Sequence, residues 1–228
     1  MHDVSTAWIV IPVFNEDRVI AQVVEETAAV FPNIVCVDDG SSDNTEEQIY
    51  GSKAHLIKHP INLGQGAALQ TGIAYALAQP GMKYVITFDA DGQHRVEDAI
   101  NMLEIAAAGD LDVVLGSRFL NANTGIPWIK RVVLRTAAAL SPTSRKLKLT
   151  DAHNGLRVMN RKAASMLQIT MNGMAHASEI VAFLARSGLR IQEAPVTVRY
   201  TDYSKAKGQS LINGVNILFD ISIRQRGM

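Results

Sequence analysis

This sequence of 228 residues has little cysteine, no excess of charge of one sign and no long apolar run. The only cysteine is Cys36, which excludes an intrachain disulfide. It lies in the apolar segment 34–37, so we expect its thiol to be buried and inert. Lysine plus arginine and aspartate plus glutamate both number 22, and this balance does not suggest nucleic acid as a partner.

Membrane-spanning helices are not predicted, because no segment approaches the roughly 20 apolar residues that one needs. The N-terminus has no basic region followed by an apolar signal core, so we expect a cytoplasmic protein. Basic residues are concentrated at 118–148 and 199–228, and an amphipathic stripe at 210–223 predicts a helix. Such a helix lies in a membrane interface or on the protein's own core. Peripheral contact with the inner membrane face is therefore open, as is the formation of a homodimer through this helix.

Apolar and helical segments alternate in the first half of the chain. Residues 7–13 are nearly all apolar, which is typical of a parallel strand buried on both faces. Further strands are expected at 34–37, 55–58, 84–88 and 113–116, and helices from about 15, at 43–50, at 66–78 and at 96–108. This alternation predicts an α/β fold with a doubly wound, mostly parallel sheet flanked by helices through about residue 118. The second half predicts helices at 129–140, 161–167 and 177–187 and strands at 155–159 and 190–200.

Carboxylates follow two of the predicted strands, and in such sheets ligands bind at the carboxyl ends of the strands. Asp89 and Asp91 are two residues apart, so in an extended segment both side chains point to one face and share a hard divalent cation. Mg²⁺ or Mn²⁺ held by one or two carboxylates usually completes its shell with phosphate oxygens and water. The segment therefore predicts a site for a nucleoside diphosphate, with Gln93 and His94 as further polar groups.

Three other segments add to this prediction. Asp38 and Asp39 precede a turn of small residues, where a carboxylate accepts hydrogen bonds from a base or a ribose, whereas Asp43 is expected to cap the next helix. Arg118 follows the strand at 113–116 and suits bidentate contact with phosphate. Glycines at 64 and 66 open a helix, where free N–H groups contact an anion or where close packing requires glycine.

Taken in order, the motifs at 11–16, 37–43, 62–67, 89–94 and 116–118 resemble those of family 2 glycosyltransferases. More narrowly, they are similar to the dolichyl-phosphate mannosyltransferase and polyprenyl-phosphate glycosyltransferase branch. The resemblance implies a GT-A fold and an inverting, Mg²⁺- or Mn²⁺-dependent transfer from a UDP- or GDP-sugar. It also implies one catalytic domain over 1–228, with a nucleotide-sugar half at 7–118, an acceptor half at 119–200 and a basic segment at 201–228.

The same resemblance assigns roles to individual residues. It implies that the nucleotide-sugar is bound by Pro12, Val13, Glu16, Asp38, Asp39, Asp89, Ala90, Asp91 and Arg118. It implies that Asp91, Gln93 and Asp89 bind the metal, and that Arg131, Arg199 and Lys205 face the acceptor phosphate. The implied catalytic residues are Asp91, Arg118, Asp151 and Glu179. Asp151 and Asn154 lie where relatives carry an aspartate before a Gly-Phe-Arg-like segment, in which the aromatic residue is here replaced by Leu156.

The acceptor remains open between two chemical types. A polyprenyl phosphate is already anionic and needs little help from a base, whereas a sugar hydroxyl requires one, for which Asp151 and Glu179 are the candidates. Glu179 also suits the start of a helix for electrostatic reasons alone. Many polyprenyl-phosphate transferases carry membrane-spanning helices after the catalytic domain, and this sequence ends at Met228. We therefore expect a peripheral enzyme, recruitment by a membrane protein, or a soluble acceptor. A noncatalytic sugar-nucleotide-binding module is the alternative of another class.

Overall fold

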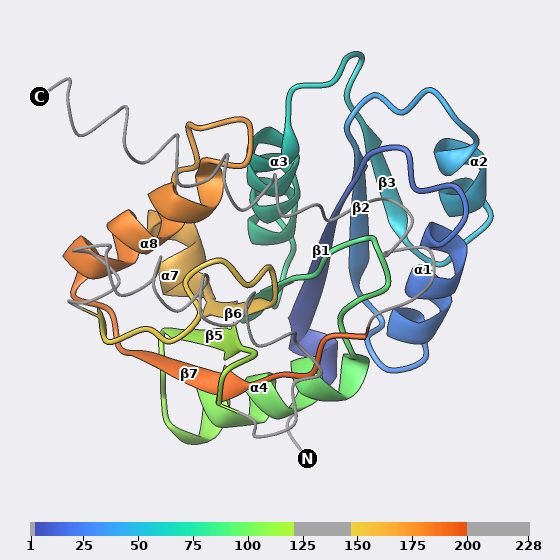
Figure 1. Ribbon diagram of the computed structural model, residues 1–228. Helices are drawn as coiled ribbons and strands as arrows, with labels where there is room; N and C mark the ends of the chain where they lie inside the picture. Colours follow the sequence, from blue (N-terminus) through green and yellow to red (C-terminus); the bar gives the residue numbers. More distant parts are fainter. Residues whose placement is uncertain (1–2, 121–146, 200–228) are drawn as a thin grey trace, which may run out of the picture.

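The computed structural model describes residues 3–120 and 147–199, which form one mixed β-sheet with helices on both faces (Figure 1). The strand order is β3-β2-β1-β4-β6-β5-β7. The strands are β1 (Ala7–Val13), β2 (Ile34–Asp38), β3 (His55–Lys58), β4 (Tyr84–Thr87), β5 (Val113–Ser117), β6 (Arg157–Asn160) and β7 (Ile191–Pro195). The helices are α1 (Ile20–Ala28), α2 (Thr45–Tyr50), α3 (Gln65–Leu77), α4 (Val96–Ala108), α7 (Arg161–Met166) and α8 (His176–Ser187), after a 3-10 turn at Val4–Thr6.

Two apolar layers enclose the sheet, and β1 contributes to both of them. Ile9 and Ile11 pack in the layer that holds α1, α2 and α4, whereas Trp8 and Val10 pack in the layer that holds α3, α7 and α8. All seven residues of β1 are buried, because side chains alternate across a strand that is covered on both faces. Cys36 is fully buried in β2, and burial raises the pKa of its thiol, so the expected inert cysteine is confirmed.

The parallel arrangement of the sheet is interrupted at β6. This strand runs antiparallel to both β4 and β5 and separates them, with Ile86 opposite Val158 and Val113 opposite Met159. The predicted mostly parallel sheet is confirmed, and its antiparallel strand β6 comes from the second half of the chain. Its insertion matters for the site, because it places Gly155 beside the end of β4, where Thr87 Oγ1 donates to the Gly155 carbonyl at 2.6 Å.

Two segment boundaries also differ from expectation. Helix α1 begins at Ile20 rather than near residue 15, because Asn15 has a φ of +53°, which a right-handed helix does not allow, and the Asn15 and Glu16 amides fix this turn by donating to the side chains of Ser41 and Thr45. The last strand ends at Pro195, because Thr197 N donates to Asp98 on α4 at 2.7 Å. The helices expected at 129–140 and 210–223 lie outside the described residues. Within the described part, no helix is long and apolar enough to cross a membrane.

Candidate active site

A cavity of about 480 Å³ lies at the carboxyl ends of the strands, where the motifs were expected to meet. Its walls come from the ends of β1, β2, β4 and β5, from the start of α3 and from the loop before β6. The residues that line it are Pro12, Val13, Phe14, Glu16, Asp39, Asn62, Gly64, Gln65, Ala68, Asp89, Ala90, Asp91, Gln93, His94, Arg118, His153, Asn154, Gly155, Met174 and Val198. The structure thus brings most of the predicted site residues into one cavity.

Asp89 is held in a fixed orientation at the end of β4. His94 Nε2 lies 2.9 Å from Asp89 Oδ2, and the Gln65 side-chain amide donates to Oδ1 at 3.3 Å. Burial raises the pKa of Asp89, but His94 and, more weakly, the buried Arg157 outweigh it and hold that pKa below its ordinary value. Asp89 is therefore a carboxylate whose negative charge is stabilised by the protein itself.

Asp91 lies in a less favourable environment. Its Oδ1 accepts a hydrogen bond from Gln93 N at 3.0 Å across the turn at Gly92, whose φ is +72°. Burial, followed by the charge of Asp89, raises the pKa of Asp91 to about 6. A carboxylate that is destabilised in this way is a good ligand for a cation, because a positive charge would offset both the cost of burying the carboxylate and its repulsion from Asp89.

The donor set fits a divalent cation that is shared with a phosphate ligand. Among residues 3–120 and 147–199, no group of three or more histidine, cysteine, aspartate or glutamate side chains is arranged to hold a metal by itself. Mg²⁺ and Mn²⁺ are commonly held by one or two carboxylates and completed by phosphate oxygens. Asp91 and the largely buried Gln93 line the cavity beside Asp89, as such a site requires.

Arg118 lies in the cavity wall and Asp151 lies behind it. Arg118 donates from Nε and Nη2 to the two carboxylate oxygens of Asp151, at 2.6 and 2.7 Å, and its backbone N donates to the same carboxylate at 3.0 Å. Burial opposes ionisation, but Arg118 lowers the pKa of Asp151 below its ordinary value. Glu193 in turn accepts from the Thr150 and Asp151 amides. The structure therefore does not bring Asp151 into the cavity wall, and its carboxylate positions Arg118.

Glu179, the other candidate base, also lies away from the cavity wall. Its carboxylate accepts hydrogen bonds from Thr170 N, Thr170 Oγ1 and Met171 N, at 2.5 to 3.1 Å. Burial raises the pKa of Glu179, but these hydrogen bonds outweigh burial and hold that pKa below its ordinary value. The carboxylate fastens the loop before α8 to that helix, and this loop carries Met174 at the edge of the cavity.

The contacts of Glu179 predict a structural effect for Glu179→Gln. The amide keeps one oxygen to accept from the backbone N–H groups but replaces charged hydrogen bonds with neutral ones near the surface, so we expect a loss of about 0.5–1.5 kcal/mol in unfolding free energy. We expect turnover to fall less than about fivefold, because the carboxylate does not line the cavity. Thermal unfolding and initial rates measure the two effects, with Thr170→Val as a control that removes one donor. A drop in turnover of about a hundredfold or more with unchanged stability is the result expected of a general base and would contradict this assignment.

The structure also decides two further expectations about the site, and that for Asp38 is not met. Asp38 is fully buried and does not line the cavity, and its Oδ1 accepts a hydrogen bond from Ser41 N at 3.0 Å. Alternate residues of β2 point to opposite faces of the sheet, and Asp38 therefore shares the buried face of Cys36.

Of the two alternatives for Gly64 and Gly66, the structure supports close packing, because a Cβ atom would lie 2.3 Å from the Asn172 carbonyl oxygen at residue 64 and 2.1 Å from the Met171 carbonyl oxygen at residue 66. The Gly64 and Gly66 amides are already used, since they donate to Asp39 and to the Asn172 carbonyl.

Of the three basic residues that were expected at the acceptor phosphate, only Arg199 is among the described residues. Its guanidinium pairs with Glu26 at 2.9 Å and lies 3.9 Å from Glu97, away from the cavity wall, while its backbone N donates to the Gln93 carbonyl. Arg199 therefore braces the loop that carries Gln93, which corrects its expected place at the acceptor phosphate. Arg131 and Lys205 lie outside the described residues.

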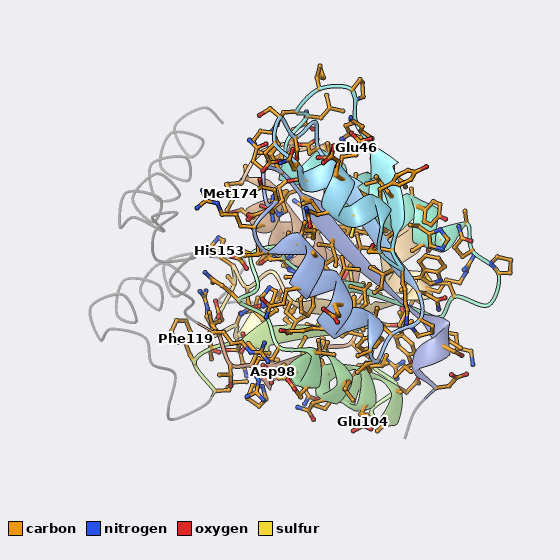
Figure 2. The ribbon with its side chains drawn as sticks, turned by 90° about the vertical axis from the view of Figure 1, so that its right-hand side faces the viewer. Glu46, Asp98, Glu104, Phe119, His153 and Met174 are labelled. Atoms are coloured by element: carbon orange, nitrogen blue, oxygen red, sulfur yellow. The ribbon has the colours of Figure 1, made fainter. Side chains whose placement is uncertain are left out.

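His153 is a cavity residue that the sequence did not single out. Figure 2 shows it on the same side of the molecule as Met174, which also lines the cavity. Its Nε2 lies 3.4 Å from Ser178 Oγ, and burial, followed by the positive charges of Arg157 and Arg118, lowers its pKa despite the opposing effect of Asp151. The lowered pKa of His153 favours the neutral imidazole near pH 7. The sequence offers no signal for this residue, since a lone histidine in a loop belongs to no motif, and its place in the cavity follows from the position of the loop before β6.

Comparisons with known proteins agree with this geometry. The model of the family described as Glycosyl transferase family 2 matches residues 8–167. A UDP-N-acetylglucosamine–dolichyl-phosphate N-acetylglucosaminyltransferase of Methanococcus voltae is 30% identical, over 96% of this chain and 96% of its own length. A polyprenol monophosphomannose synthase of Mycolicibacterium smegmatis is 26% identical, over 92% of this chain and 82% of its own length.

Solved structures are similar in fold. Glucosyl-3-phosphoglycerate synthase of Mycobacterium tuberculosis, crystallised with Mn²⁺, UDP and glucosyl-3-phosphoglycerate, superimposes with a TM-score of 0.66. The superposition covers 89% of this chain and 75% of that one, at 16% sequence identity. At this level of identity the likeness establishes the fold alone.

Proposed function

Since this chain belongs to glycosyl transferase family 2, we propose that it transfers a sugar, with inversion, from a UDP- or GDP-sugar to a polyprenyl phosphate. It is a glycosyltransferase, and its fold is the GT-A fold, as the sequence resemblance implied. We place the reaction at the cytoplasmic face of the membrane, with the donor bound in the cavity between Asp39 and Arg118.

A divalent cation, Mg²⁺ or Mn²⁺, would be held by Asp91 and Gln93 with Asp89 beside them. When bound, it offsets the negative charge that develops on the departing nucleoside diphosphate. The protein's own residues supply the rest of the binding site. His94 and Gln65 orient Asp89, and Asp151 fixes the guanidinium of Arg118 so that it presents its charge to phosphate oxygens.

A phosphate acceptor is favoured because both candidate bases already form hydrogen bonds within the protein. Asp151 is bound by Arg118, and Glu179 is bound by Thr170 and Met171, so neither carboxylate is placed to remove a proton in the cavity. A phosphate monoester already carries a nucleophilic oxygen anion near neutral pH and does not need a strong base. The names of the dolichyl-phosphate and polyprenol relatives support the same acceptor class.

A second candidate is a glycosyltransferase that extends a soluble or lipid-linked glycan. The observation in its favour is His153, because a neutral imidazole in the cavity wall is able to accept the proton of a sugar hydroxyl. In that case His153, rather than Asp151 or Glu179, is the base.

A transfer assay with both acceptor types separates these two functions. The purified chain is incubated with Mn²⁺ or Mg²⁺, a panel of radiolabelled UDP- and GDP-sugars, and either a short-chain polyprenyl phosphate or oligosaccharide acceptors. We expect the label to enter an organic-extractable product only when the polyprenyl phosphate is present, and Asp91→Asn serves as the inactive control. Label on the oligosaccharides alone would identify the second function, and no transfer to either acceptor across the donor panel would contradict both.

A further inference from the structure

The carboxylate of Asp39 is surrounded by hydrogen-bond donors on its protein side. His59 Nδ1 lies 2.7 Å from Asp39 Oδ1, Leu63 N donates to the same oxygen at 3.0 Å, and Gly64 N donates to Oδ2 at 2.7 Å. His59 is itself fixed from the other side, because its Nε2 lies 3.0 Å from Thr71 Oγ1 on α3. The side chain of Asp39 is 3% exposed and that of His59 is 10% exposed, so water does not compete freely for these bonds.

These contacts nearly exhaust the acceptor capacity of the carboxylate. An ionised carboxylate offers about four lone-pair positions, two on each oxygen. His59 and Leu63 occupy both positions of Oδ1, and Gly64 occupies one position of Oδ2. No other hydrogen bond to this carboxylate is formed within residues 3–120 and 147–199. One acceptor position remains, and Asp39 lines the cavity.

The position of Asp39 in the sheet indicates which part of a nucleotide it meets. Asp39 follows β2, Asp89 and Asp91 follow β4, and β1 lies between these strands. Two strand spacings amount to roughly 10 Å, a length comparable to that of a nucleoside. With the diphosphate beside Asp91, the base therefore reaches Asp39 along the apolar end of β1, where Pro12 and Val13 line the cavity.

We propose that His59 is a specificity-determining residue: together with the Leu63 and Gly64 amides it restricts Asp39 to a single acceptor position, so that the donor site selects uridine over guanosine nucleotides. This inference rests on the proposed function, because it assumes that the cavity binds a nucleotide-sugar. It assigns His59 a positioning role that acts on the base through Asp39.

The selectivity follows from the hydrogen-bonding edges of the two bases. Uracil presents one ring N–H between two carbonyl groups, so a single acceptor position satisfies its only donor on that edge. Guanine presents a ring N–H and an adjacent amino group, which a carboxylate pairs only when both of its oxygens are available. Here the second donor would face Oδ1, which His59 and Leu63 already fill, and an unpaired buried donor is costly. Cytosine presents a ring nitrogen acceptor where uracil has its N–H, so its ring would face Asp39 with a lone pair, and its amino donor lies displaced along the edge.

Calorimetric titration of the full chain with UDP, GDP and CDP in the presence of Mn²⁺ tests the proposal directly. We expect UDP to bind about tenfold or more tightly than GDP or CDP. Equal or tighter binding of GDP would overturn the inference and leave the proposed function standing, since nucleotide binding would remain. Failure of all three nucleotides to bind would overturn both.

Two variants of His59 then separate specificity from simple structural support. His59→Phe removes the donor to Oδ1, and we expect the preference for UDP over GDP to fall by about fivefold or more, because the guanine amino group gains an acceptor. His59→Asn retains an N–H donor close to the Nδ1 position and is expected to keep the preference. If His59→Phe weakens both nucleotides equally, the assignment of specificity to His59 is wrong. If that variant does not fold, the wild-type preference decides.

Discussion

Replacing Asp91 with asparagine is expected to lower turnover by a factor of about 10² to 10³ and, at the same time, to stabilise the metal-free protein. The loss of turnover follows from the loss of the carboxylate that best fits a divalent cation beside the diphosphate. The gain in stability follows from the pKa of Asp91, which burial and the charge of Asp89 raise to about 6. Above that pH, the folded state carries the cost of a buried charge that the unfolded chain does not have.

The sign of the stability effect is therefore fixed. A carboxyl group whose pKa is raised on folding loses stability as pH increases through the interval between its unfolded value and about 6, so the neutral asparagine avoids this loss at pH 8. We expect a gain of about 1–2 kcal/mol, which corresponds to a rise of a few degrees in the midpoint of thermal unfolding.

Thermal unfolding at pH 8, with and without UDP and Mn²⁺, measures both effects in one series. The wild-type protein is expected to gain stability from the nucleotide only when Mn²⁺ is present, since a ligand that binds the folded state alone raises its stability. The Asp91→Asn variant should start higher and gain little. Glu104→Gln is the matched control, because Glu104 is exposed on α4, away from the cavity (Figure 2). A Mn²⁺-dependent gain that survives in Asp91→Asn would contradict the assignment of the metal site.

The residues that the sequence placed correctly in the cavity share one property, which is that they lie at the carboxyl ends of strands. Pro12 is near the end of β1, whereas Asp39, Asp89 and Arg118 come shortly after β2, β4 and β5, and each lies in the cavity wall. A strand can be identified from its apolar pattern, and the carboxyl ends of parallel strands meet at one edge of the sheet. Placement at that edge therefore follows from local sequence alone, although the contribution of each residue to binding is a prediction that the variants above must test.

The residues that the sequence placed wrongly depend on contacts between distant segments. Asp151 and Glu179 are acidic residues near the site, but a sequence does not show whether a carboxylate faces a cavity or a set of protein donors. The first faces Arg118 and the second faces the Thr170 and Met171 amides. His153 was missed for the same reason. It enters the cavity only because β6 inserts between β4 and β5, and this antiparallel strand was not expected there.

The insertion of β6 also gives Gly155 its importance, and Gly155→Ala is expected to reduce turnover by about a hundredfold or more. A Cβ atom at residue 155 would lie 2.1 Å from Asp89 Oδ2 and 2.6 Å from Asp89 Cγ. These distances are too short for any contact, so the carboxylate would have to move. Asp89 has a short side chain that His94 and Gln65 hold in place, and its displacement breaks those hydrogen bonds. A misplacement of about 1 Å in a binding group is sufficient for a hundredfold loss.

Steady-state kinetics and thermal unfolding of Gly155→Ala and Gly173→Ala test this explanation together. Gly173 lies in the loop that borders the cavity beside Met174, but a Cβ atom there would meet no atom within 4 Å. The same chemical change at residue 173 should therefore leave turnover and stability nearly unchanged, whereas Gly155→Ala should also lose about 1–3 kcal/mol of stability through overpacking. Full turnover in Gly155→Ala would mean that the position of Asp89 is not critical, and the donor site would then depend on Asp91 and Arg118 rather than on the carboxylate that β6 and His94 hold in place.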